Sequence, residues 1–270
     1  VWDEGWWWRA GHWRGGRAMG LSLDGSQMLA AAAVFAVAGL VKGVVGLGLP
    51  TVSMALLALF LPTGQAAAWL LLPSLVTNVL QMRPAGTLGP VLRRLWPMQL
   101  GVVIGTLGGV GWWGPLGQAA GARQLLGGAL VLYALWGLWG RSVAVPQAHQ
   151  GWLGAVVGLV TGAITALTGV FVVPAVAYLQ ALQLPRPALM QAMGLSFTVS
   201  TLALGAGLGG LAGGSGPLDG VTLGVSVAML LPALVGMAWG GRLRARLSAA
   251  VFKQVLMGSL LALGAWMLCA

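Results

Sequence analysis

The stretch LVKGVVGLGLP, residues 40–50, places a lysine in a long apolar run and follows it with glycines and a proline. Lys42 is the only charged residue between Met28 and Met82. A cation at the centre of a membrane helix costs about 2.5–3.5 kcal/mol on insertion scales. Two arrangements of the lysine side chain would offset that cost. Either Lys42 attracts an anion at a water-filled cavity, or its ammonium reaches the lipid headgroups by snorkelling.

Other polar residues in the apolar runs are candidates for the same chemistry. Helix N-termini after Pro50 and Pro174 would add backbone N–H groups that favour an anion. The predicted substrate-binding residues are Lys42, Gly43, Gly46, Gly48, Thr51, Ser53, Ser74, Asn78, Gln81, Thr161, Thr165, Thr168, Ser196 and Ser200. Ser74, Asn78 and Gln81 share one helical face. Hydrogen bonding between helices that stabilises a bundle is the alternative role for their side chains.

The sequence offers little material for catalysis. It contains four acidic residues, and three of them, Asp3, Glu4 and Asp24, precede the first apolar run. The two histidines have no carboxylate or cysteine cluster beside them, and Cys269 is the only cysteine. Acid–base, nucleophilic and metal-dependent chemistry all need such groups in proximity. We therefore predict neither an enzyme nor a cofactor.

Composition identifies the class of protein that must position these residues. Hydrophobic residues make up 58% of the chain and charged residues only 7%, whereas soluble domains carry about a quarter. The apolar runs are continuous rather than alternating, which predicts an all-α polytopic membrane protein and not a β-barrel. The net charge of +10 comes from short arginine clusters between apolar runs, a pattern typical of membrane topology rather than of nucleic-acid binding.

Ten apolar segments can be drawn, with about 8–10 of them crossing the membrane. They cover residues 28–45, 49–61, 66–82, 95–113, 123–140, 151–168, 170–183, 188–209, 218–239 and 250–269. The second and seventh are too short to cross a core of about 30 Å as helices. Broken or re-entrant helices are therefore expected in each half, with breaks at 43–50 and about 165–174.

The two halves resemble each other. AVAGLVKG (36–43) and AVVGLVTG (155–162) share six of eight residues. Further along, Pro97, Gly101 and Gly105 correspond to Pro232, Gly236 and Gly240. We predict a first membrane repeat over 27–141 and a second over 150–270. Five segments per half is an odd number, so the halves form an inverted repeat.

Topology follows from the arginine clusters. Alternation through ten segments puts Arg83, Arg93, Arg94, Arg141, Arg186, Arg242, Arg244 and Arg246 on one side, which the positive-inside rule assigns to the cytoplasm. Both termini then face the opposite side. Gly101, Gly105 and Gly109 are expected to form a close-packing face between helices.

Residues 1–26 differ from the remainder, since they are rich in Trp, Arg and Gly. We expect an N-terminal tail that is either non-native or disordered, with Met19 as the natural start. The alternative is a peripheral segment whose tryptophans lie among the headgroups.

The glycine-rich break GLVKGVVGLGLP, the LP pair that follows at 61–62, the run SLVTNVLQ (74–81) and the duplicated layout resemble the sulfite exporter TauE/SafE family. The resemblance covers about residues 27–270. Leu47 and Leu49 stand where small residues would be expected, and the second break, TALTGVFVVP, contains little glycine. The resemblance implies transport of a sulfite-like, sulfonate-like or organic anion across the inner membrane of a bacterium.

Other functions remain open from the sequence. A channel-like anion pore and a membrane scaffold without substrate are the alternatives to a transporter. The expected partners are a small anion and membrane lipid, with no nucleic acid, and a homo-oligomer is left open.

Overall fold

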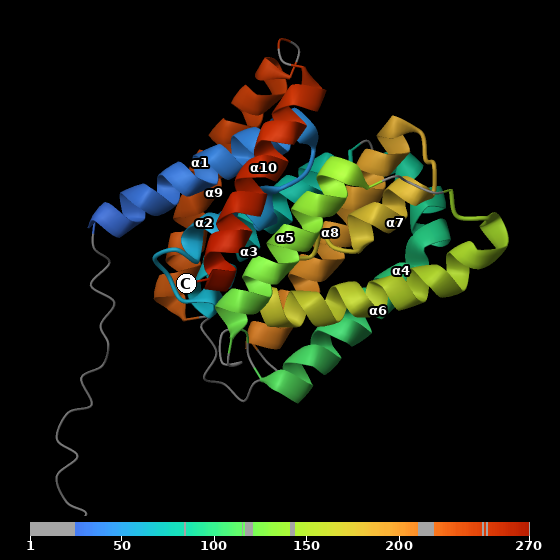
Figure 1. Ribbon diagram of the computed structural model, residues 1–270, viewed down its shortest axis with the longest axis horizontal. Coiled ribbons are helices and arrows are strands. Elements are labelled where there is room, and N and C mark those ends of the chain that lie inside the picture. Colours follow the sequence, from blue (N-terminus) through green and yellow to red (C-terminus); the bar gives the residue numbers. More distant parts are fainter. Residues whose placement is uncertain are drawn as a thin grey trace, which may run out of the picture.

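The computed structural model describes residues 25–83, 85–114, 116, 121–140, 144–209, 219–244, 246 and 248–269. These residues form helices and no strand (Figure 1). The α-helices are α1 (Gly25–Val45), α2 (Leu49–Leu57), α3 (Thr63–Gln81), α4 (Leu88–Trp113), α5 (Ala122–Trp139), α6 (Gln150–Thr168), α7 (Ala175–Ala181), α8 (Arg186–Gly209), α9 (Gly220–Leu243) and α10 (Ala249–Cys269). Single 3-10 turns lie at η1 (Ala85–Thr87) and η2 (Gln147–His149).

Five stretches are long and apolar enough to cross a membrane: Gly25–Val45, Gln147–Thr168, Arg186–Gly209, Gly220–Leu243 and Val251–Cys269. The all-helical, membrane-spanning class predicted from composition is therefore confirmed. Of the predicted tail, Gly25 and Ser26 begin α1, and residues 1–24 lie outside the described part of the chain.

Each predicted segment corresponds to one helix, but some boundaries differ. Helix α1 continues through Val45, so Gly43 is helical and the first break is confined to residues 46–48. Helix α4 begins at Leu88 rather than residue 95, and it therefore contains Arg93 and Arg94, which we had placed in a loop. Pro90 stands in its first turn, where a missing N–H disrupts no intrahelical hydrogen bond.

Two helix pairs are packed with their backbones in contact. Helix α1 lies against α9, and α4 lies against α6. A Cβ atom built on Gly39 would lie 2.1 Å from the Ala233 carbonyl oxygen, and one on Gly236 would lie 2.0 Å from the Ala36 carbonyl oxygen. No side chain fits at such distances, so glycine is required at both positions of this interface.

The α4–α6 pair has the same construction. A Cβ on Gly101 would lie 2.3 Å from the Ala155 carbonyl oxygen, and one on Gly158 would lie 2.1 Å from that of Met98. Gly105 meets the backbone of Leu159, and Gly109 meets the Ala166 side chain. The predicted close-packing face of α4 is therefore confirmed.

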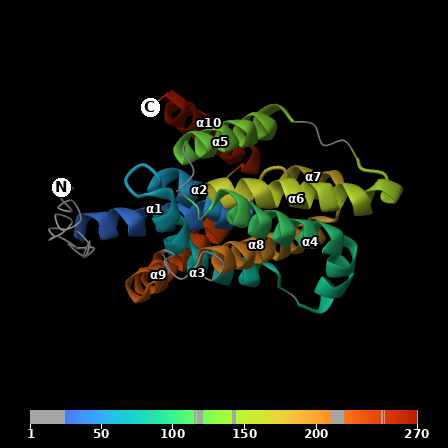
Figure 2. The ribbon, with the colours of Figure 1, turned by 90° about the horizontal axis from the view of Figure 1, so that it is seen from below.

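Helices α3 and α8 pack against each other between these pairs, since α3 also contacts α9 and α8 also contacts α4. Figure 2 shows α5 and α10 lying together on the opposite side of the molecule. The short helix α2 contacts α1, α3, α5 and α10. The break between α1 and α2 is therefore buried among neighbouring helices rather than lying at the surface.

Candidate functional site

Lys42 lies in the interior of the protein. Its side chain, near the C-terminal end of α1, is only 3% exposed, and its ammonium donates a hydrogen bond to Asn78 Oδ1 on α3. Among the described residues, the only carboxylate belongs to Asp219. It caps the N-terminal end of α9, whereas Lys42 lies near the C-terminal end of α1. Snorkelling to the headgroups is therefore not what offsets the cost of Lys42 here.

A chain of hydrogen bonds extends from Lys42 through α3 to α8. Asn78 Nδ2 donates to Ser74 Oγ at 3.1 Å, and Ser74 Oγ lies 3.1 Å from Thr201 Oγ1. Thr201 in turn donates to the Phe197 carbonyl oxygen at 2.6 Å, within its own helix. Three helices are thus connected at one buried polar network, and the Asn78 carboxamide is oriented with its oxygen toward the ammonium.

The first break is held open by glycine and cross-linked by a glutamine. Gly46 has φ +80° and Gly48 has φ +103°, both in the left-handed region that residues with a Cβ rarely adopt. Gln81 Nε2 donates to the Gly46 carbonyl oxygen at 2.9 Å and to that of Met190 at 3.2 Å. The Gln81 side chain on α3 therefore satisfies the Gly46 carbonyl oxygen, which is freed where α1 ends, and also connects this break to Met190 in α8.

The N-terminal part of α2 carries two hydroxyl groups without partners. Thr51 and Ser53 are fully buried, and neither hydroxyl has a hydrogen bond within the described structure. A buried polar group left unpaired costs about 1–3 kcal/mol. Helix α2 begins at Leu49 with Pro50 in its first turn, and Gly48 precedes it as the N-cap. Unused hydrogen-bonding capacity is therefore concentrated just after the break.

The predicted residues of α6 are arranged differently. Thr161 Oγ1 donates to the Val157 carbonyl oxygen at 2.7 Å, and Thr165 Oγ1 donates to that of Thr161 at 2.8 Å. Thr168 Oγ1 accepts from Val170 N at 3.1 Å and fixes the start of the second break, where Gly169 has φ +70°. These hydroxyl groups are hydrogen-bonded within their own helix and its end.

Of the predicted residues, the structure brings together Lys42, Ser74 and Asn78, with Gln81 and Gly46 joined beside them. Gly43 instead faces α9, where its Cβ would lie 2.3 Å from the Met237 carbonyl oxygen. The buried residues Ser196 and Ser200 lie on α8, outside the hydrogen-bond chain of Lys42.

The residues predicted from the sequence did not include two buried polar residues of α4, Gln99 and Thr106. Gln99 Nε2 donates to Ser196 Oγ at 2.9 Å, while Gln99 Oε1 and Thr106 Oγ1 have no partner among the described atoms. Gln99 lies inside the apolar run 95–113, and that position is the sequence signal that could have identified it. Thr201 was visible as a hydroxyl residue of segment eight, but its bond to Ser74 depends on how α3 and α8 cross.

The family comparison agrees with this architecture. The model of the sulfite exporter TauE/SafE family matches residues 31–267. The chain belongs to the sulfite exporter TauE/SafE family. Comparison with curated proteins gave no match, and comparison with solved structures gave none either. The match spans both helix breaks, all of the hydrogen-bond network and nearly all of the ten helices.

Membership in the TauE/SafE family establishes the broad class. The family consists of transporters and not enzymes, and its name refers to export of a small anion, sulfite. The chain is a multi-pass membrane protein of this transporter family, consistent with its five long apolar helices.

Proposed function

We propose that the protein carries a small sulfur-containing or organic anion, of the sulfite or sulfonate kind, across the cytoplasmic membrane of a bacterium. The observation that carries this proposal is the buried ammonium of Lys42, which has an amide partner but no counter-ion in the described structure. The transported anion supplies the missing charge when it binds.

The hydrogen-bonding capacity of Lys42 supports this role. An ammonium group has three N–H donors, and Asn78 Oδ1 accepts one of them. A charge buried without a counter-ion is expensive, and an uncompensated one is the usual mark of a functional site within a membrane. An oxyanion carries negative charge and accepts several hydrogen bonds at once. It can therefore both neutralise the Lys42 ammonium and accept its remaining N–H donors.

The start of α2 adds donors of the right kind. Helix α2 has nine residues, and its first N–H groups are unsatisfied by the helix itself. The free hydroxyl groups of Thr51 and Ser53 lie in the same short helix. We infer that the anion is held between Lys42 and the first turns of α2, with Gly46 and Gly48 giving it access to the backbone.

The two halves, 27–141 and 150–270, are proposed to be inverted repeats. The packing of α1 on α9 corresponds to that of α6 on α4, because exchanging the halves exchanges these two pairs. The contacts of α3 with α9 and of α8 with α4 correspond in the same way. Transport would proceed by rocking of one group of helices against the other around the fixed site, as in other inverted-repeat carriers.

The proposed topology puts the α3–α4 and α9–α10 connections in the cytoplasm. Arg123 falls on the other side, where its guanidinium lies 4.6 Å from the Trp266 ring centroid in a cation–π contact. Cysteines introduced at the exposed Gly86 and Ser248, with Cys269 replaced, should both resist an impermeant thiol reagent added outside intact cells. Labelling of only one of them would overturn the inverted arrangement.

Sulfite uptake into proteoliposomes tests the function directly. Lys42→Ala should raise the half-saturation concentration at least about tenfold, because a hydrogen bond to a charged group contributes about 1.5–3 kcal/mol. Lys42→Arg should lose less. The matched control is Lys253→Ala, which replaces the only other lysine of the sequence. Lys253 lies on α10, and the variant should behave as the wild type.

Saturable flux with an unchanged half-saturation concentration in Lys42→Ala would remove Lys42 from the site. A carrier should also show uptake that is accelerated by anion on the far side of the membrane. Electrical conductance without such acceleration would favour the channel-like pore, and the absence of flux for sulfite, thiosulfate, sulfonates and carboxylates would favour the scaffold.

A further inference from the structure

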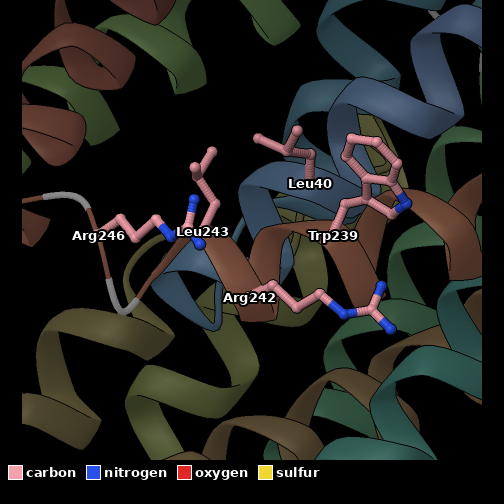
Figure 3. A pocket seen from close by; sticks show the side chains of 5 residues that line it. All are labelled: Leu40, Trp239, Arg242, Leu243 and Arg246. Atoms are coloured by element: carbon pink, nitrogen blue, oxygen red, sulfur yellow. The ribbon is translucent and has the colours of Figure 1, made fainter.

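A groove of about 590 Å³ lies at the C-terminal end of α9, and none of the side chains that line it belongs to the hydrogen-bond network of Lys42. It is lined by Leu40 from α1 and by Trp239, Arg242, Leu243 and Arg246 from α9 and the turn that follows. Figure 3 shows the Trp239 ring beside Leu40, with the two arginine side chains extending on either side of these apolar groups. The groove therefore combines an apolar wall with two cationic edges.

Both guanidinium groups are available to a ligand. Arg242 and Arg246 are exposed, and neither has a hydrogen bond or an ion pair within the described part of the chain. Arg94 offers a contrast, since it lines a second basic pocket but is bonded to Gln150 Oε1 at 3.0 Å and contacts the Leu182 carbonyl oxygen. A guanidinium without a partner is a planar donor fork that favours an oxyanion such as phosphate, and the groove carries two of them.

The apolar part of the groove indicates what is attached to that oxyanion. Trp239 is 65% exposed at the end of a membrane-spanning helix, where indole rings mark the boundary between lipid tails and headgroups. Free phosphate would gain nothing from Leu40 and Trp239. A phospholipid would place its phosphate at the arginines and its acyl chains along the apolar wall.

We propose that this groove is a binding site for an anionic phospholipid, with Arg242 and Arg246 holding the headgroup and Trp239 and Leu40 contacting the start of the acyl chains. Charge decides the choice of lipid. The described residues around the groove carry no carboxylate that could repel an acidic headgroup or attract the choline of a zwitterionic one. Basic pockets at the ends of membrane helices bind acidic headgroups in the same manner.

Native mass spectrometry of the purified full chain tests the site, with phosphatidylglycerol and phosphatidylcholine of identical acyl chains as probes. The wild type should retain phosphatidylglycerol in preference to phosphatidylcholine. The double variant Arg242→Gln, Arg246→Gln should lose at least about tenfold in its affinity for phosphatidylglycerol. Arg186→Gln, at an exposed arginine that begins α8, is the matched single-charge control and should bind like the wild type.

A second readout guards against a variant that fails to fold. Added phosphatidylglycerol should raise the thermal unfolding midpoint of the wild type and of Arg186→Gln, but not that of the double variant, in the same detergent. Equal retention of the two lipids, undiminished binding by the double variant, or an equal loss in Arg186→Gln would overturn the proposal. Displacement of the lipid by inorganic phosphate alone would also overturn it, since the apolar wall would then contribute nothing.

Discussion

The region from α1 through the first break into α2 and the region from α6 through the second break into α7 share a backbone plan but not a chemistry. In both, glycines four residues apart face a partner helix, at Gly39 and Gly43 and at Gly158 and Gly162. In each region a glycine with positive φ, Gly48 or Gly169, then lies between the long helix and the short helix that follows. The plan is therefore set by close packing of glycine against backbone and by the glycine that lies between each long helix and the short helix after it.

The two regions differ in the side chains that stand on this shared backbone arrangement. Lys42 is buried with an unneutralised charge and is followed by unpaired hydroxyl groups on α2, whereas its counterpart Thr161 is satisfied by the carbonyl oxygen of Val157. Duplicated geometry therefore does not imply a duplicated site. The comparison teaches that the two halves differ in unused polar capacity: the first half holds a lysine, as well as hydroxyl groups without partners among the described atoms, whereas the hydroxyl groups of α6 are satisfied.

The largest effect is expected where the two regions are alike. Gly39→Leu and Gly158→Leu should each abolish folded protein, because the new Cβ atoms would lie about 2.1 Å from a carbonyl oxygen of the neighbouring helix. Overpacking of a core costs about 1–3 kcal/mol even when side chains alone must shift, and here backbone must move. Size-exclusion profiles in detergent measure the folded fraction. Gly108→Leu on α4, whose Cβ would meet nothing within 4 Å, is the control and should remain folded.

The second prediction exchanges the missing counter-ion for a built-in one. Asn78→Asp should neutralise Lys42 internally and raise the half-saturation concentration for sulfite at least about tenfold, because substrate would then compete with a fixed carboxylate. Ser200→Asp, at a buried position of α8 outside the hydrogen-bond chain of Lys42, should instead lower the folded fraction. Flux and thermal unfolding measured on both variants separate these outcomes. Unchanged affinity in a folded Asn78→Asp protein would contradict the counter-ion role of the substrate.

The third prediction concerns the breaks themselves. Gly48→Ala and Gly169→Ala should each destabilise the protein by about 1–2 kcal/mol, since alanine is strained at φ +103° and +70°. In addition, the Gly48 variant should slow transport, because this backbone adjoins the proposed anion site. Thermal unfolding and sulfite flux distinguish the two halves. Equal flux in both variants would mean that the first break has no special role.

The smallest effect is expected at the helix ends. The side chain and backbone N–H of Thr222 hydrogen-bond Asp219 and lower the pKa of this N-cap carboxyl, whereas Thr87 gives α4 no side-chain cap. A depressed pKa means that the carboxylate stabilises the folded state above its unfolded pKa and loses this contribution as pH falls through the folded value. Protection of the amides in the first turn of α9 against hydrogen exchange, measured relative to their intrinsic rates at each pH, should therefore fall below about pH 4, while that of α4 should not. Asp219→Asn should reduce this pH dependence.

Much of the architecture followed from the sequence because membrane helices obey simple rules. Backbone groups in lipid must be satisfied within a helix, so each apolar run gave one helix, and the two short runs gave α2 and α7. The close contact of another helix at Gly101 and Gly105 was likewise predictable, since small residues four positions apart let helix backbones approach. Lys42 was conspicuous for the same reason, as the only charged residue between Met28 and Met82.

Only the tertiary structure decided where these features point. The sequence left Lys42 open between lipid headgroups and the interior, and the approach of α3 to α1 placed its ammonium on Asn78. The bond between Ser74 and Thr201, and that between Gln99 and Ser196, depend on how helices far apart in the sequence cross. Helical period gives the face on which a residue lies, but not which helix faces it. Packing of glycine against backbone fixes how α1 lies on α9 and how α4 lies on α6, whereas α1 meets α3 at Lys42 through a hydrogen bond between side chains.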